Sequence, residues 1–167
     1  MAVLPDALAP GLKVVFCGTA AGGASARIGA YYAGPGNRFW HTLYSLGLTP
    51  HRFEPGDFRE VLAYGIGLTD VVKSASGRDA EISGEVYDVE GFVTKMRAHT
   101  PRAIAFNGKN AAKAYFGRPR VDFGRQSETI ADAVLFVVPS TSGAARGWWD
   151  ETYWREVAEF VRACHDD

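Results

Sequence analysis

The sequence has too few cysteines, and no suitable histidine pattern, for the common covalently linked or metal-bound scaffolds. Cys17 and Cys164 are the two cysteines among 167 residues, which excludes a disulfide framework and a four-cysteine zinc or iron–sulfur site. The four histidines do not have the spacing of metal ligands. We therefore expect two reduced thiols and no metal.

Long hydrophobic runs are also absent. No apolar stretch approaches the length of a membrane span, and the N-terminus lacks the charged and then apolar pattern of a secretory signal. These absences predict a soluble, cytoplasmic protein with no membrane partner.

Positive charge is not in excess either. The formal net charge is −1, which does not favour a protein that coats DNA non-specifically. One local cluster contains Arg118, Arg120 and Arg125, with Lys109 and Lys113 just before it. An ordinary solvated surface is the simpler interpretation of this cluster.

What the chain does contain is an alternation of buried-strand and helix patterns. With 47% hydrophobic residues it can form one compact domain over residues 1–167. Apolar runs that suit strands occur at 14–16, 65–72, 103–106 and 133–138, and the second of them is expected to break into a turn at Thr69-Asp70. Helical patterns occur at 37–46, 53–64, 89–99, 110–116 and 149–164, and loops are expected at 73–85 and 117–126. The alternation predicts an α/β fold, a three-layer α/β/α sandwich with a short, mainly parallel central sheet of about four strands.

The segment after the first predicted strand is unusually poor in side-chain bulk. Gly18 is expected to end that strand, and residues 19–25 are nearly all Gly, Ala, Ser or Thr. A ligand can lie directly on the backbone N–H groups of such a loop. The pattern is neither a dinucleotide fingerprint nor a P-loop, and no nucleophile elbow is present. Loops 19–32, 69–73 and 140–147 should leave the sheet at one edge, so we expect a binding pocket there.

Several motifs, taken in order, resemble those of one family. The residues concerned are Lys-Val-Val-Phe-Cys-Gly at 13–18, Gly22, Tyr32, Pro35, Asn-Arg-Phe-Trp at 37–40, Gly-Leu-Thr at 67–69, Asn-Gly-Lys at 107–109, Pro139, Ser142-Gly143 and Arg146. Their order and spacing resemble the mismatch-specific uracil/thymine DNA glycosylases of the uracil-DNA glycosylase superfamily. The resemblance covers nearly the whole chain.

The resemblance implies removal of a mismatched uracil from duplex DNA without a cofactor. The nucleotide must first be flipped out of the stack, at a cost of a few kcal/mol that is lower at a mismatch. In the family, the aromatic ring that matches Tyr32 stacks on the base, although a core position is the alternative for this side chain. Ser25 matches a position beside C5 of the pyrimidine. The implied base-pocket residues are Thr19, Ala20, Gly22, Ser25, Tyr32 and Ser140.

The resemblance also implies contacts with DNA. Residues Gly143, Ala144, Ala145 and Arg146 match the segment that enters the stack where the base has left. A wedge of this kind usually carries an apolar side chain, and Ala144 is small, so weaker reading of the opposite base is expected. Arg146 can reach the widowed base or a phosphate, with a plain surface arginine as the alternative. Lys109 is a further predicted DNA contact.

The first motif departs from the family pattern at its catalytic position. The family usually has Gly-x-Asn-Pro-Gly, whose asparagine positions the attacking water, whereas residues 18–22 here read Gly-Thr-Ala-Ala-Gly. A carboxylate near the sugar can stabilise the developing cation and act as general base. Asp70 is the candidate because it follows a strand beside the first loop, although a turn or cap role is equally compatible. Asp88 is held in reserve, since a helix N-cap explains it.

Three functions therefore remain open from the sequence. The first is a monomeric, monofunctional glycosylase for uracil in G·U or related mismatches, with Asp70 in place of the asparagine and with other damaged pyrimidines or single-stranded DNA as further substrates. The second is a protein that binds damaged DNA but does not cut the glycosidic bond, which Ala20 favours. The third is an enzyme that acts on free nucleosides or another small ligand. No lysine in these loops suggests a Schiff-base route.

Overall fold

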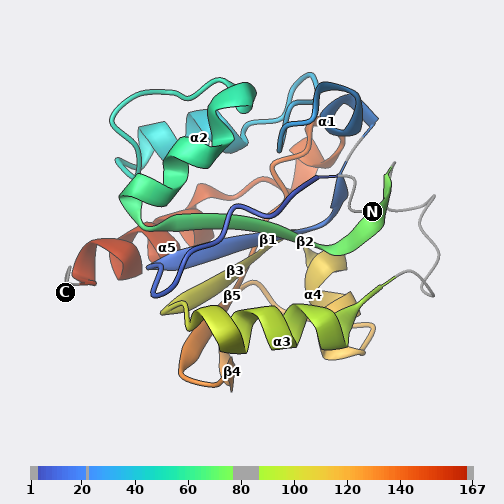
Figure 1. Ribbon diagram of the computed structural model, residues 1–167, viewed down its shortest axis with the longest axis vertical. Coiled ribbons are helices and arrows are strands. Elements are labelled where there is room, and N and C mark those ends of the chain that lie inside the picture. The colour runs from blue at the N-terminus through green and yellow to red at the C-terminus, as the bar shows by residue number, and fades with distance from the viewer. Residues whose placement is uncertain (1–3, 22, 77–86, 165–167) are drawn as a thin grey trace.

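The strands of the chain form one sheet between two layers of helices (Figure 1). The computed structural model describes residues 4–21, 23–76 and 87–164. The elements in order are β1 (Val14–Ala21), α1 (Gly23–Ile28), α2 (Phe39–Ser45), the 3₁₀ helix η1 (Pro55–Tyr64), β2 (Ile66–Ser76), α3 (Val89–His99), β3 (Ala103–Asn107), α4 (Lys109–Phe116), β4 (Gly124–Ile130), β5 (Ala133–Val138), the 3₁₀ helix η4 (Gly143–Trp148) and α5 (Glu151–Ala163). Within the described residues the sheet has five strands in the order β2-β1-β3-β5-β4. Only the β4–β5 pair is antiparallel. The predicted three-layer α/β/α sandwich is confirmed.

The central strands are buried on both faces, as their unbroken apolar runs predicted. α1, α2 and α5 cover one face, where α2 and α5 make aromatic contacts: the Phe16 ring lies 5.4 Å from both Phe39 and Trp154. On the other face α3 and α4 cover the sheet around Phe92 and Phe106, whose rings are 5.9 Å apart. Figure 1 shows α3 and α4 together below the sheet and α1 and α2 above it. No helix within the described residues is long and apolar enough to cross a bilayer.

The strand count was too low by one. β4 was not predicted: it begins in the predicted loop 117–126 and continues through residues that were assigned to no element, because its sequence, GRQSETI, is mostly polar. Its residues alternate between buried or half-buried and exposed positions, as expected for an antiparallel edge strand with one face in water. A period-two pattern this poor in apolar side chains gives little signal in the sequence.

Two strands also run further than predicted. Gly18 does not end β1, and no turn interrupts β2 at Thr69-Asp70. The reason is the parallel ladder between them, which pairs Gly18 with Asp70 and Ala20 with Val72. These pairings supply backbone hydrogen bonds to the end of β1. The small residues there did not by themselves indicate a strand. The predicted loop 19–32 therefore contains the end of β1 and the short helix α1, and part of the predicted loop after residue 72 belongs to β2.

The helix predictions are largely confirmed. α2 lies within the predicted range 37–46 and buries Phe39, Trp40 and Leu43. α3 follows the predicted cap Asp88, and the segment 53–64 forms η1 and not an α-helix. α5 begins at Glu151 and not at residue 149, and its Trp154 is fully buried and donates from Nε1 to the carbonyl of Pro139 at 2.9 Å.

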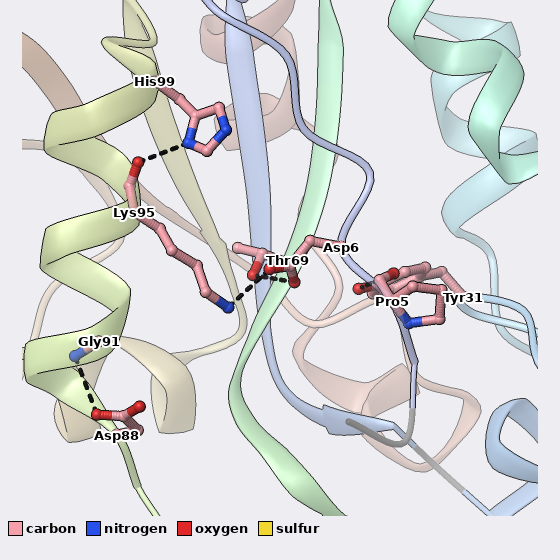
Figure 2. A network of polar contacts seen from close by, with 8 residues as sticks. All are labelled: Pro5, Asp6, Tyr31, Thr69, Asp88, Gly91, Lys95 and His99. Carbon is pink, nitrogen blue, oxygen red and sulfur yellow. Dashed lines mark hydrogen bonds and ion pairs between the residues drawn. The ribbon is translucent and has the colours of Figure 1, made fainter. Parts of the chain in front are cut away.

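Residues 4–7 form an N-terminal strap across the free edge of β2. Ala7 makes an antiparallel bridge with Leu68, with N–H···O distances of 3.0 and 2.9 Å. Asp6 accepts from the Thr69 hydroxyl at 2.7 Å and pairs with Lys95 Nζ at 2.7 Å (Figure 2). The Tyr31 hydroxyl donates to the carbonyl of Pro5 at 3.1 Å. The strap thus joins the β2 edge, α3 and the segment after α1.

We expect Asp6→Ala to destabilise the fold more than Lys95→Met. Removing the Asp6 carboxylate leaves the fully buried Thr69 without its acceptor, which typically costs about 1–3 kcal/mol. Removing the Lys95 ammonium breaks an ion pair whose lysine is 38% exposed, so the cost should be below about 1 kcal/mol. Urea unfolding of both variants measures the difference. Equal losses would show that the ion pair, and not the buried hydroxyl, is what the strap contributes.

Candidate functional site

The carboxyl ends of three neighbouring strands meet at one edge of the sheet. β1 lies between β2 and β3, and the chain leaves β1 for one neighbour and later returns to the other. This arrangement is a topological switch point, the place where open α/β sheets bind ligands. Gly18 on β1, Asp70 on β2 and Asn107 on β3 all belong to this edge.

The side chains of Asp70 and Tyr32 both come close to the backbone of Gly18. A Cβ atom built there would lie 2.7 Å from Asp70 Oδ1 and 3.3 Å from the hydroxyl oxygen of Tyr32. Both oxygens therefore converge on the α-carbon of Gly18, and a larger residue would displace the carboxylate. Asp70 is 5% exposed. The structure thus places the predicted catalytic candidate beside the predicted stacking residue.

Tyr32 has two unusual features. Its backbone has φ +54°, a left-handed conformation that non-glycine residues seldom adopt. Its ring stacks on Phe39, with centroids 4.0 Å apart and an interplanar angle of 27°. One face of the ring is therefore covered, and a base can stack only on the opposite face.

The Tyr32 hydroxyl is buried without a hydrogen-bond partner, alone in this among the side-chain polar atoms of the described residues. Burial raises the pKa of this phenol well above its ordinary value, and the negative charge of Asp70 raises it further. The nearby amide of Asn107 acts in the opposite direction with a smaller effect. The group therefore stays protonated, as a hydrogen-bond donor.

Asn107 fixes the loop that follows β5. Its Nδ2 donates to Thr141 Oγ1 at 3.0 Å, and its Oδ1 accepts from the Thr141 backbone N–H at 3.1 Å. The Thr141 carbonyl in turn accepts from the Arg38 N–H at 3.0 Å. Sequence reasoning treated Asn107 only as part of a motif. The available signal was a polar residue at the carboxyl end of an otherwise apolar buried strand, at the predicted ligand edge.

The other predicted base-pocket residues lie around this edge. Ser25 is buried on α1, and its hydroxyl accepts from the Ala33 N–H at 3.0 Å, so it holds the loop that carries Tyr32. Thr19 is buried within β1. Ala20 pairs with β2, but its side chain, like the whole of Gly22, lies outside the described residues.

Ser140 and the predicted DNA-contacting segment approach the same edge. A Cβ at Gly108 would lie 3.2 Å from Ser140 Cβ, so the two loops are in contact. Gly143 begins η4, which also contains Ala144 and Ala145, and a Cβ at Gly143 would lie 3.2 Å from the Pro35 carbonyl oxygen. The side chain of Arg146 lies outside what the structure describes. The loops after β1 and β5 are therefore packed together.

The side chains of two predicted residues make other contacts, although the Asp88 N–H donates to the Val71 carbonyl, next to Asp70, at 3.2 Å. Asp88 caps α3, where its Oδ1 accepts from the Gly91 N–H at 2.9 Å (Figure 2), and α3 covers the opposite face of the sheet from Tyr32. Lys109 begins α4 with its Nζ 4.5 Å from the centre of the Phe123 ring. In the described part of the chain no three His, Cys, Asp or Glu side chains are grouped as metal ligands.

Comparisons with known proteins identify a family and a fold. A family model described as the Uracil DNA glycosylase superfamily matches residues 5–162. Among solved structures, the chain is similar to a candidate uracil DNA glycosylase from Methanosarcina acetivorans, solved by NMR in solution, with a TM-score of 0.63 and 23% identity over 95% of each chain. At that identity the structural match establishes the fold alone.

Because Tyr31 and Tyr32 are buried, we expect the folded protein to lose stability at alkaline pH. Burial, followed by the Asp70 charge, raises the pKa of both Tyr31 and Tyr32 in the folded protein, whereas both ionise near pH 10 once unfolded. Their contribution to stability is therefore complete below about pH 10 and falls as the pH rises, by up to about 1.4 kcal/mol per pH unit for each tyrosine. Urea unfolding from about pH 9 to about pH 11.5 measures the effect. The free energy of unfolding should fall less steeply with pH for the Tyr31→Phe/Tyr32→Phe double variant than for the wild type. Parallel curves for the wild type and the variant would contradict this assignment.

Proposed function

The chain belongs to the uracil DNA glycosylase superfamily, and from this membership we propose that it is a monofunctional DNA glycosylase that removes uracil from G·U mismatches in duplex DNA. The observation that carries the proposal is the convergence of the Asp70 carboxylate and the Tyr32 hydroxyl on Gly18 at the switch-point edge. The partner is double-stranded DNA, and hydrolysis requires no cofactor.

Base recognition begins with flipping of the nucleotide, because a base inside the stack is out of reach. The extruded uracil stacks on the face of Tyr32 that Phe39 does not cover. Backbone groups of Thr19, Gly22 and Tyr32 bind its edge, while Ala20 and Ser140 line the pocket. Ser25, which already fixes the loop through Ala33, lies beside C5 of the base.

Asp70 then acts on the attacking water. The water oxygen forms a bond to C1′ of the sugar while the bond from C1′ to the base breaks, and its electron pair leaves with the base. One water proton passes to the Asp70 carboxylate, and the departing base takes a proton from solvent. A positioned general base of this kind contributes about 10²–10⁴-fold to the rate. The burial of the carboxylate beside Gly18 supports this role, since a short distance and a fixed orientation are what it needs.

The DNA-facing segment is assigned to residues 143–146 with Lys109. Because Ala144 and Ala145 are small, they fill the space left by the flipped base poorly. The proposal therefore includes weak discrimination of the opposite base, and activity on other damaged pyrimidines or on single-stranded DNA. Arg146 and Lys109 bind phosphates, which gives the affinity a dependence on salt.

A second function has one observation in its favour. Ala20 stands where the family usually has the water-positioning asparagine. A protein that recognises damaged DNA without hydrolysing it would fit this substitution. The two functions differ in whether a base is released.

The test is incubation with duplexes that contain G·U or A·U pairs and with a uracil-containing single strand, followed by alkali. Alkali breaks the strand only where a base has been removed. Breaks that require the protein support the glycosylase. Salt-sensitive binding without breaks would favour the damage-binding protein instead.

Asp70→Asn should reduce single-turnover release of uracil by about 10²–10⁴-fold, because the amide cannot take the proton from water. The two side chains have the same shape, so circular dichroism and melting temperature report whether folding is intact. A folded Asp70→Asn variant with full single-turnover activity would remove Asp70 from the mechanism.

Gly18→Ala should also reduce single-turnover release of uracil, although it removes no reactive group. The new methyl would lie 2.7 Å from Asp70 Oδ1, so the carboxylate must turn away, and a misplacement of about 1 Å can cost about 10²-fold. Gly56→Ala is the matched control, since its Cβ meets nothing within 4 Å. If both variants release uracil at the wild-type rate, the position of Asp70 over Gly18 does not matter for the reaction.

A further inference from the structure

The buried, unpartnered hydroxyl of Tyr32 requires an explanation beyond base stacking. A phenylalanine would stack on a base as well and would leave no polar atom in the interior. An unsatisfied buried hydroxyl typically costs stability, so its presence points to a partner that the free protein does not itself provide.

The surroundings of the hydroxyl indicate where that partner lies. The Tyr32 hydroxyl oxygen and Asp70 Oδ1 converge on the α-carbon of Gly18, yet the hydroxyl makes no direct hydrogen bond to the carboxylate. The amide of Asn107 makes its two short hydrogen bonds with Thr141. A third polar atom that contacts both oxygens would satisfy the phenol.

We propose that the Tyr32 hydroxyl is the second hydrogen-bonding partner of the attacking water, which it shares with Asp70. This inference rests on the proposed function and goes beyond it, because the resemblance assigns Tyr32 only to the base. Tyr32 is thus a positioning residue for the nucleophile.

One water molecule can hydrogen-bond to both Asp70 and the Tyr32 hydroxyl and still attack the sugar. Water has two protons and two lone pairs, and Asp70 accepts one proton while the phenol donates to one lone pair. The second lone pair remains directed at C1′. Tyr32 keeps its own proton throughout, because burial and the Asp70 charge raise its pKa. The bond changes at the sugar and the proton transfer to Asp70 are those given above.

The test compares Tyr32→Phe with Tyr31→Phe in the full-length protein. Tyr32→Phe keeps the ring on Phe39 and removes only the hydroxyl, so we expect single-turnover uracil release to fall about 10- to 100-fold. Affinity for a duplex that carries 2′-fluoro-deoxyuridine, whose glycosidic bond resists hydrolysis, should be unchanged. The melting temperature should not fall, since an unsatisfied polar group has been removed.

Tyr31→Phe is the matched control. Its hydroxyl has a partner, the Pro5 carbonyl, so this variant should lose some thermal stability while releasing uracil at the wild-type rate. Equal rates for Tyr32→Phe and the wild type would overturn the inference and leave the proposed function standing. A lowered melting temperature of Tyr32→Phe together with weaker duplex binding would overturn it as well, in favour of a structural role. A wild-type protein that releases no uracil would overturn both proposals.

Discussion

The site depends on the parallel ladder between β1 and β2. Because the pairing of Gly18 with Asp70 is fixed by the backbone, the aspartate side chain projects over a residue that has no side chain of its own. A shift of the register by one residue would turn Asp70 to the opposite face of the sheet. The position of the carboxylate is therefore set by a ladder of backbone hydrogen bonds that extends over several residues, and not by a flexible loop.

The remaining contacts at the edge bring the other loops to this ladder. Asn107 binds Thr141, Thr141 binds Arg38, and Ser25 binds Ala33, so the segments after β1, β3 and β5 are linked through buried polar groups. The Asn107 and Ser25 bonds involve short side chains, and the Thr141–Arg38 bond joins two backbone groups, which makes the arrangement stiff. Such stiffness suits the proposed reaction, in which a base and a water are held in one relative position.

The sequence was sufficient for the layers and for most helices, because those depend on apolar periodicity. It was insufficient for β4, whose polar residues give no signal until the neighbouring strand is known. At the site, the order of the loops predicted that those carrying Asp70 and Tyr32 leave the sheet at one edge, and both side chains do approach Gly18 there. The end of β1 was misplaced because glycine and alanine have low intrinsic strand preference, and only pairing with β2 keeps them extended. The approach of Asp70 to Gly18 and the two hydrogen bonds between Asn107 and Thr141 could not be predicted. Both depend on how the strands and loops are placed in space.

The strap formed by residues 4–7 has a consequence for the solution behaviour of the molecule. β2 is an outer strand, and the exposed amides and carbonyls of an outer strand can pair with another molecule. Ala7 occupies two of these groups at Leu68, in the most apolar part of the strand. If the strap is displaced, the unpaired edge of β2 can pair with other molecules. Substitutions that weaken the strap should therefore show first as precipitation during expression.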